Sequence, residues 1–137
     1  MFFSQKRIME SWLEDRRLET RVDIPDLLIL KLRKRGLFQA SLEAKSRDLS
    51  NHGIRFVTTK NFKKGQQLHL EWSFPQAFQG EQKMKCQCRV INVQKSRDDG
   101  GYRISCRFIN LNSGQEETLK QFIWLYELEP STFRKAA

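Results

Sequence analysis

Asp48-Leu49-Ser50-Asn51-His52-Gly53 is the stretch that decides the fold, because it stands between two segments with the spacing of β-strands. Apolar residues recur at every second position before it, and a short apolar run follows it. A period of two residues is typical of a strand with one buried face. The residues that carry this pattern are Phe38, Ala40, Leu42 and Ala44, then Ile54, Phe56 and Val57. The stretch has the form DxSxxG and joins two predicted strands, and its turn-forming residues also fit an ordinary turn.

Four further strands follow from the same kind of pattern. Apolar residues alternate over residues 28–33 and 67–72, and two longer arms lie at about 84–94 and 102–109. Asp98-Asp99-Gly100-Gly101 separates these arms and is a strong signal for a hairpin turn. Six short strands with turn residues between them predict a mainly β fold, a six-stranded antiparallel β-barrel.

A C-terminal α-helix is expected after the last strand. Ser113 fits an N-cap, and Glu116 fits the second half of a capping box. One apolar stripe at helical spacing follows, formed by Leu119, Phe122, Ile123 and Tyr126. We expect this stripe to belong to the core and to cover one end of the barrel.

A short N-terminal helix is expected over residues 4–14, because Ile8 and Trp12 recur at helical spacing. We favour a helix packed on its own domain, and the alternative is a helix that lies on a membrane surface or a partner. The chain then divides into an N-terminal helical extension over residues 1–15, a barrel domain with its C-terminal helix over 16–127, and a flexible basic tail over 128–137.

The composition favours an anionic partner in a reducing compartment. The 25 Lys and Arg residues against 16 Asp and Glu give a net charge of +9. No apolar run is long enough to span a membrane, and the first residues lack the apolar segment of a signal peptide. Three cysteines are an odd number without zinc-ribbon spacing, so we expect no metal site, the minor alternative being Cys86 and Cys88 with His52 or His69.

A second motif lies upstream, in Arg16-Arg17-Leu18-Glu19-Thr20-Arg21, where Arg17 and Arg21 form an RxxxR pattern on a predicted linker. RxxxR alone is a weak signal, since Arg103 and Arg107 also match it inside a predicted strand, where two solvated arginines are expected. In this order, RxxxR followed by DxSxxG resembles the signature of the PilZ domain, a bacterial receptor module for cyclic di-GMP. The resemblance covers about residues 16–126 and implies a six-stranded antiparallel β-barrel with a C-terminal helix.

The resemblance implies a set of ligand-binding residues and no catalytic or metal-binding ones. Arginine suits the ligand because its planar fork binds phosphate oxygens in pairs and can donate to O6 and N7 of guanine. Asp48 offers acceptors for N1–H and N2–H₂ of guanine, and adenine lacks these donors. Ser50 can bond near the same base or to the local backbone, and Gly53 would serve backbone geometry. The implied set is Arg16, Arg17, Arg21, Asp48, Ser50 and Gly53.

Arg16 leads to a further hypothesis, that the domain holds a self-intercalated dimer of cyclic di-GMP, a mode that occurs in the family. The alternative is a solvated arginine paired with Glu14, Asp15 or Glu19. The resemblance implies a cytoplasmic bacterial receptor or adaptor that is not an enzyme. Ligand binding would order the linker at residues 16–21 and reorient the N-terminal helix, and an unidentified protein effector in motility, pilus, biofilm or secretion machinery would recognise the change.

Two other functions remain open. One is a PilZ-like adaptor that binds protein without a nucleotide, although such relatives usually lack one of the two motifs. The other is a small basic barrel that binds single-stranded nucleic acid through the basic stretches at residues 31–35 and 60–64, with Phe56, Phe62 and Trp72 as stacking platforms. We regard nucleic acid as the less favoured partner, because aromatic residues in strands usually belong to the core.

Overall fold

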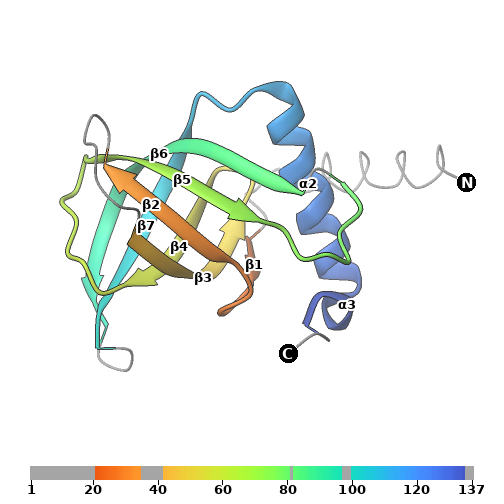
Figure 1. The fold of residues 1–137 in the computed structure, drawn as a ribbon, viewed down its shortest axis with the longest axis horizontal. Helices are drawn as coiled ribbons and strands as arrows, with labels where there is room; N and C mark the ends of the chain where they lie inside the picture. Colours follow the sequence, from red (N-terminus) through yellow and green to blue (C-terminus); the bar gives the residue numbers. More distant parts are fainter. Residues whose placement is uncertain (1–20, 35–41, 81, 97–99, 135–137) are drawn as a thin grey trace, which may run out of the picture.

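The computed structural model describes residues 21–34, 42–80, 82–96 and 100–134, and their strands close into a barrel with a helix at one end (Figure 1). Its strands are β1 (Arg21–Asp23), β2 (Ile29–Lys34), β3 (Leu42–Ser50), β4 (Gly53–Thr58), β5 (Gln67–Ser73), β6 (Lys83–Lys95) and β7 (Tyr102–Ile109). The strand order is β1-β3-β2-β5-β6-β7-β4, and pairing of β3 with β4 closes β2 to β7 into a ring. The prediction of a six-stranded antiparallel β-barrel is confirmed, and the expected N-terminal helix lies outside the described residues.

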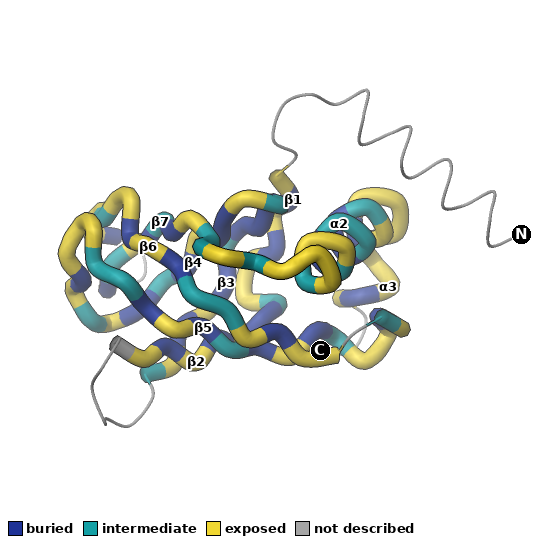
Figure 2. Tube along the Cα trace, turned by 90° about the horizontal axis from the view of Figure 1, so that it is seen from above, coloured by how far each residue is buried: buried dark blue, intermediate teal, exposed yellow. Residues whose placement is uncertain are grey.

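Alternation along the strands separates an inner from an outer face (Figure 2). In β5, Leu68, Leu70 and Trp72 are buried, whereas His69 between them is exposed. This is the period of two residues that the sequence shows, and it places the large apolar side chains inside the barrel. The outer face carries mostly polar and charged side chains, with Ile29 and Ile91 as exposed apolar exceptions.

The helix α2 (Ser113–Leu128) covers one end of the barrel (Figure 1). Its predicted apolar stripe is buried, and the ring of Phe122 contacts those of Phe74 and Phe78 at centroid distances of 4.9 and 5.4 Å. Aromatic contacts of this kind add to the free energy gained by burying the rings. The expectation that the stripe belongs to the core is confirmed.

The N-cap of α2 lies one residue earlier than predicted. The side chain of Asn112 accepts a hydrogen bond from the backbone N–H of Gln115 at 2.8 Å, and the Gln115 side chain accepts one from the backbone N–H of Asn112 at 3.1 Å. The prediction of Ser113 with Glu116 is therefore wrong. Asn caps a helix as well as Ser does, and Gln can replace Glu in a capping box, so the sequence contains two overlapping signals.

The segment after α2 differs from the expected flexible tail. Residues Pro130–Arg134 form a second helix, α3, and the ring of Phe133 is buried at a centroid distance of 5.3 Å from Phe122. The guanidinium of Arg134 donates to the hydroxyl of Tyr126 and to the carbonyl oxygen of Pro25. One buried aromatic side chain thus anchors a segment whose composition indicated only a basic tail.

The short strand β1 was not expected, because the sequence placed Arg21 on a linker. Arg21 instead begins β1, which pairs with β3 from outside the closed ring. Val22 is buried opposite Leu49, so the inner face of β1 packs on the core. The backbone at Arg21 is consequently fixed against β3, next to the DxSxxG segment.

Candidate functional site

A β-bulge at Arg47 determines the direction in which the Asp48 side chain points. Ser46 lies opposite Phe56, and both are buried on the inner side of the β3–β4 pair. The register then shifts by one residue, so that Asp48 lies opposite the exposed Arg55. Without the extra residue, Asp48 would share the inner face with Ser46. The bulge therefore places a carboxylate on the outer face of the barrel.

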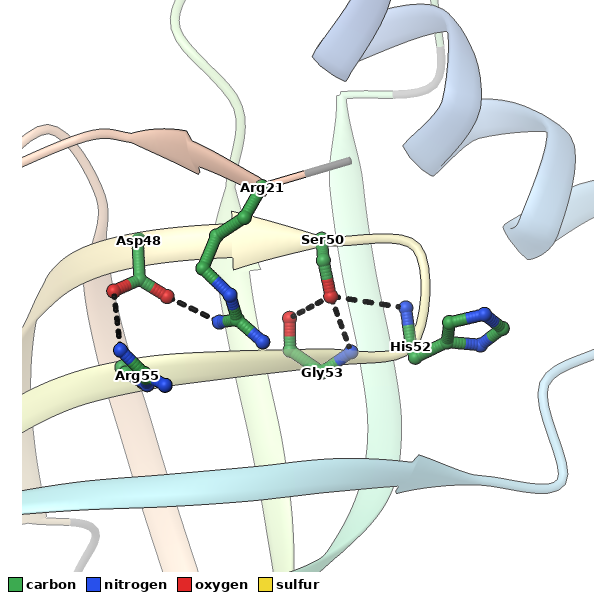
Figure 3. Close-up of polar contacts among 6 residues, drawn as sticks. All are labelled: Arg21, Asp48, Ser50, His52, Gly53 and Arg55. Atoms are coloured by element: carbon green, nitrogen blue, oxygen red, sulfur yellow. Dashed lines mark hydrogen bonds and ion pairs between the residues drawn. The ribbon is translucent and has the colours of Figure 1, made fainter. Parts of the chain in front are cut away.

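Two arginines contact the carboxylate of Asp48 (Figure 3). Nη1 of Arg21 donates to Oδ1, and Nη1 of Arg55 lies 3.6 Å from Oδ2. The Asp48 side chain is 11% exposed, against 31% for Arg21 and 46% for Arg55. The carboxylate is therefore more shielded from solvent than either guanidinium group that contacts it. Such charge-assisted contacts are stronger than neutral hydrogen bonds, so the three side chains form one electrostatic unit.

Ser50 holds the turn between β3 and β4 (Figure 3). Its buried Oγ accepts hydrogen bonds from the backbone N–H groups of His52 and Gly53 at 3.2 and 3.1 Å, and it donates to the carbonyl oxygen of Gly53 at 3.3 Å. The sequence left two roles open for Ser50, a bond near the base or a bond to the local backbone. These contacts are of the second kind. They fix the shape of the turn next to Asp48.

Gly53 is required by the close approach of two strands. A Cβ atom at this position would lie 2.2 Å from the carbonyl oxygen of Cys106 in β7, a distance that real contacts do not show. Any side chain at position 53 would force β4 and β7 apart. The glycine of the motif therefore serves backbone packing, as the sequence analysis expected.

A row of residues crosses the outer face from β1 to β6. Arg21 lies opposite Ser50, Gly53 lies opposite Arg107, and Arg107 lies opposite Arg89. Ser50 and Gly53, which we call the floor, are the small members of this row and are buried, and exposed guanidinium groups stand on both sides of them. This arrangement suits a ligand that carries negative charge.

The structure brings together four of the six predicted site residues: Arg21, Asp48, Ser50 and Gly53. Arg16 and Arg17 lie outside the described residues. Arg55, Arg89 and Arg107 were missed. Arg107 had been noted in the second RxxxR match, where solvated arginines were expected, and Arg103 and Arg107 are indeed exposed. The register that sets Arg107 beside Gly53 cannot be obtained from the sequence.

No group of three or more His, Cys, Asp or Glu side chains in the described part of the chain is arranged to hold a metal ion. A hydrogen bond with Cys106 and burial raise the pKa of the Cys88 thiol, and burial raises the pKa of Cys86 to about 12. These two thiols stay protonated at neutral pH, and metal ligands must be thiolates. Within residues 21–134, gaps excepted, no helix has the length and apolar character needed to cross a membrane.

The family model of the PilZ domain matches residues 15–124, which include both motifs and the whole barrel. The chain belongs to the PilZ domain family. The resemblance that the two motifs indicated is therefore confirmed. No curated protein matches the sequence.

Solved structures share the fold of this PilZ domain. The inhibitor of motility MotI/DgrA from Bacillus subtilis is 17% identical with a TM-score of 0.69, over 83% of this chain and 52% of that chain. The PilZ domain of YcgR from Escherichia coli, solved with c-di-GMP, is 18% identical with a TM-score of 0.66, over 89% of this chain and 99% of that chain. MrkH from K. pneumonia, in its c-di-GMP complex, is 18% identical with a TM-score of 0.67, over 88% and 55%. The chain thus spans about half the length of MotI/DgrA and MrkH and nearly all of the YcgR domain.

Proposed function

We propose that this PilZ domain is a receptor for cyclic di-GMP and that it acts as an adaptor, not as an enzyme. The observation that carries the proposal is the carboxylate of Asp48, which the Arg47 bulge turns to the outer face beside Arg21 and Arg55. A carboxylate matches the N1–H and N2–H₂ donors of guanine, and guanidinium groups match the phosphates of the cyclic dinucleotide. Structures of YcgR and MrkH that were solved with c-di-GMP share the fold.

Binding in this account is an exchange of partners at Asp48. The carboxylate of Asp48 is bound to Arg21. A guanine that donates to Asp48 releases the Arg21 guanidinium, which then binds a phosphate of the same ligand. Each broken charge-assisted contact is replaced by another, so the exchange costs little electrostatic free energy. Ser50 and Gly53 contribute by keeping the turn and the floor in place.

Arg16 and Arg17 complete the proposed site by continuity of the chain. They precede Arg21, the first residue of β1, by only a few positions. Because Arg21 is anchored against β3, the length of an extended chain limits Arg17 to about 14 Å from it. We propose that Arg17 binds a phosphate and that Arg16 holds the second molecule of an intercalated ligand dimer.

The proposed output is a change at the N-terminal side of the domain. Binding at Arg21 would order the preceding residues against the barrel, and the entropy lost is offset by the contacts with phosphate. A protein effector of the cytoplasm would recognise the altered surface. Motility, pilus, biofilm or secretion machinery are the processes we propose for it.

One observation favours the adaptor without nucleotide as a second candidate. Ser50 and Gly53 each have a structural role in the turn and in strand packing, so these two motif positions are needed with or without a ligand. Single-stranded nucleic acid is less favoured, because Phe56, Phe62 and Trp72 are buried and cannot stack on bases.

A competition experiment separates these candidates. Fluorescently labelled cyclic di-GMP is bound to the wild-type chain and then displaced by unlabelled cyclic di-GMP, cyclic di-AMP or GTP. The receptor predicts displacement by cyclic di-GMP at concentrations at least about tenfold lower than by either control. Cyclic di-AMP lacks the guanine contacts, which give about 1–3 kcal/mol each, and GTP presents only one guanine without the second nucleotide of the ring. Folded protein that does not bind the labelled ligand would favour the adaptor without nucleotide.

A further inference from the structure

A recess of about 440 Å³ opens beside the β3–β4 turn. Three elements line it: the turn with Asn51 and His52, the end of β7 with Arg107 and Phe108, and the first turn of α2 with Glu116. Asp48, Ser50 and Gly53 are not among its lining residues. The recess adjoins the ligand floor, because Arg107 stands directly opposite Gly53 and adjacent strands lie about 4.8 Å apart.

The recess offers two hydrogen-bond acceptors that have no partner among the described residues. Oδ1 of Asn51 is buried and forms no hydrogen bond with that part of the chain. Leaving such an atom without a partner costs free energy, and a donor from a ligand would recover it. The exposed carboxylate of Glu116 forms no ion pair with another described residue. Both side chains line the recess, so a group with N–H donors can bind the Glu116 carboxylate directly and reach Asn51 Oδ1 once that buried atom is uncovered.

The recess also has an uncompensated positive charge at its edge. Arg107 and Arg89 lie directly opposite each other in β7 and β6, and both are exposed. Like charges in this position destabilise a pair of strands. Neither arginine forms an ion pair with a carboxylate in the part of the chain that the structure describes. An anion bound between them would relieve the repulsion and gain two charge-assisted contacts.

We propose that this recess is a second guanine subsite, in which Asn51 and Glu116 accept from N1–H and N2–H₂ of the base while Arg107 and Arg89 bind the phosphate of the same nucleotide. The ring of Phe108, which lines the recess, provides an apolar contact for the base. The inference rests on the proposed function. The guanine belongs either to the second half of the ligand molecule at Asp48 or to a second ligand molecule, and the chemistry is the same in both cases.

The test is isothermal titration of the full chain and of the Glu116→Gln variant with cyclic di-GMP and with cyclic di-AMP. Glu117→Gln is the matched control, because it makes the same change one position along the helix, outside the recess. Glu116→Gln should weaken cyclic di-GMP binding about tenfold and leave cyclic di-AMP binding unchanged, because adenine lacks the donors that the carboxylate accepts. Glu117→Gln should behave as wild type toward both.

Two further variants change residues outside α2, so their effect on ligand affinity does not depend on the stability of that helix. Asn51→Ala removes the second acceptor without touching α2 and should also reduce cyclic di-GMP affinity about tenfold. Arg107→Gln should weaken both dinucleotides, since phosphate is common to them. If the wild type binds two ligands per chain and Glu116→Gln binds only one, the guanine belongs to a second molecule. If both bind one ligand per chain and Glu116→Gln binds it more weakly, the guanine belongs to the same molecule. Either result supports the subsite.

Failure of the inference is distinct from failure of the proposed function. If the wild type binds cyclic di-GMP and Arg21→Ala does not, while Glu116→Gln and Asn51→Ala bind as Glu117→Gln does, the subsite is overturned and the receptor stands. If the folded wild type binds no cyclic di-GMP, both are overturned.

Discussion

Arg21 and Asp48 form an ion pair across β1 and β3, although the register sets Arg21 opposite Ser50 and Asp48 opposite Asp23. The Arg21 side chain therefore reaches diagonally along the pair of strands to the carboxylate. This contact links the end of the RxxxR motif to the start of the DxSxxG motif. A ligand that uses both side chains must take the place of this pair.

Replacing Asp48 with Asn should remove the preference for guanine. The amide keeps one acceptor but loses the second and the charge, so cyclic di-GMP affinity should fall roughly tenfold while cyclic di-AMP affinity stays constant. The lost ion pair, which is partly exposed, should lower the free energy of unfolding by no more than about 1 kcal/mol. Titration with both dinucleotides and urea denaturation measure the two effects. An unchanged ratio of the two affinities would exclude Asp48 from base recognition.

Gly53→Ala should weaken the fold itself. The added methyl group would lie 2.2 Å from the carbonyl oxygen of Cys106, so β4 and β7 must separate. We expect the free energy of unfolding to fall by about 2 kcal/mol. Ser105→Ala, in the neighbouring β7 pair, is the control and should stay within about 0.5 kcal/mol of wild type. Equal stability of Gly53→Ala and wild type would contradict the role assigned to the glycine.

The barrel could be predicted because its strands alternate cleanly and its turns carry strong signals. Leu68, Leu70 and Trp72 illustrate the alternation, and all three are buried. The strand β1 could not be predicted, because a three-residue strand with a single buried residue, Val22, has no period to detect. The cap of α2 was misplaced by one residue, because Asn112 and Ser113 are both good N-caps.

The sequence motifs identified several residues of the site, but they did not predict which side chains lie next to one another on the outer face. Bringing Asp48 and Arg21 together needed the resemblance to a family, since local patterns contain no information about contacts between distant strands. The bulge at Arg47, which decides the face on which Asp48 lies, has no signature in the sequence. Arg107 and Arg89 become neighbours of the floor only through the strand register.

Phe133→Ala tests whether α3 belongs to the folded domain. The buried Phe133 ring packs against Phe122 and Tyr126, so its loss should lower the free energy of unfolding by about 3 kcal/mol. Ser131→Ala, at an exposed position of the same helix, should have little effect. Thermal or urea denaturation gives both values. If Phe133→Ala matches Ser131→Ala, the segment is a flexible tail as the sequence alone indicated.

The buried thiols predict a dependence of stability on alkaline pH. The pKa of Cys86 is raised by burial from 9.0 to about 12, so the unfolded thiol loses its proton first as the pH rises. Its contribution to the free energy of unfolding is therefore complete below pH 9 and is lost between pH 9 and 12. Urea denaturation across this range should show a fall that is smaller in Cys86→Ala. Alkylation of Cys86 by iodoacetamide at pH 8 should be slower in the native than in the unfolded protein, because the thiol is partly buried and its pKa is raised; equal rates would contradict the raised pKa.

The most direct test of the central claim is isothermal titration of cyclic di-GMP into the wild-type chain, Arg21→Ala and Arg103→Ala. Arg103 is the matched control, because it is an exposed arginine of the second RxxxR match and lies outside the proposed site. We predict that wild type and Arg103→Ala bind alike and that Arg21→Ala binds at least about tenfold more weakly, the loss expected for a hydrogen bond to a charged group. Absence of binding by the folded wild type, or equal affinity of Arg21→Ala, would contradict the account.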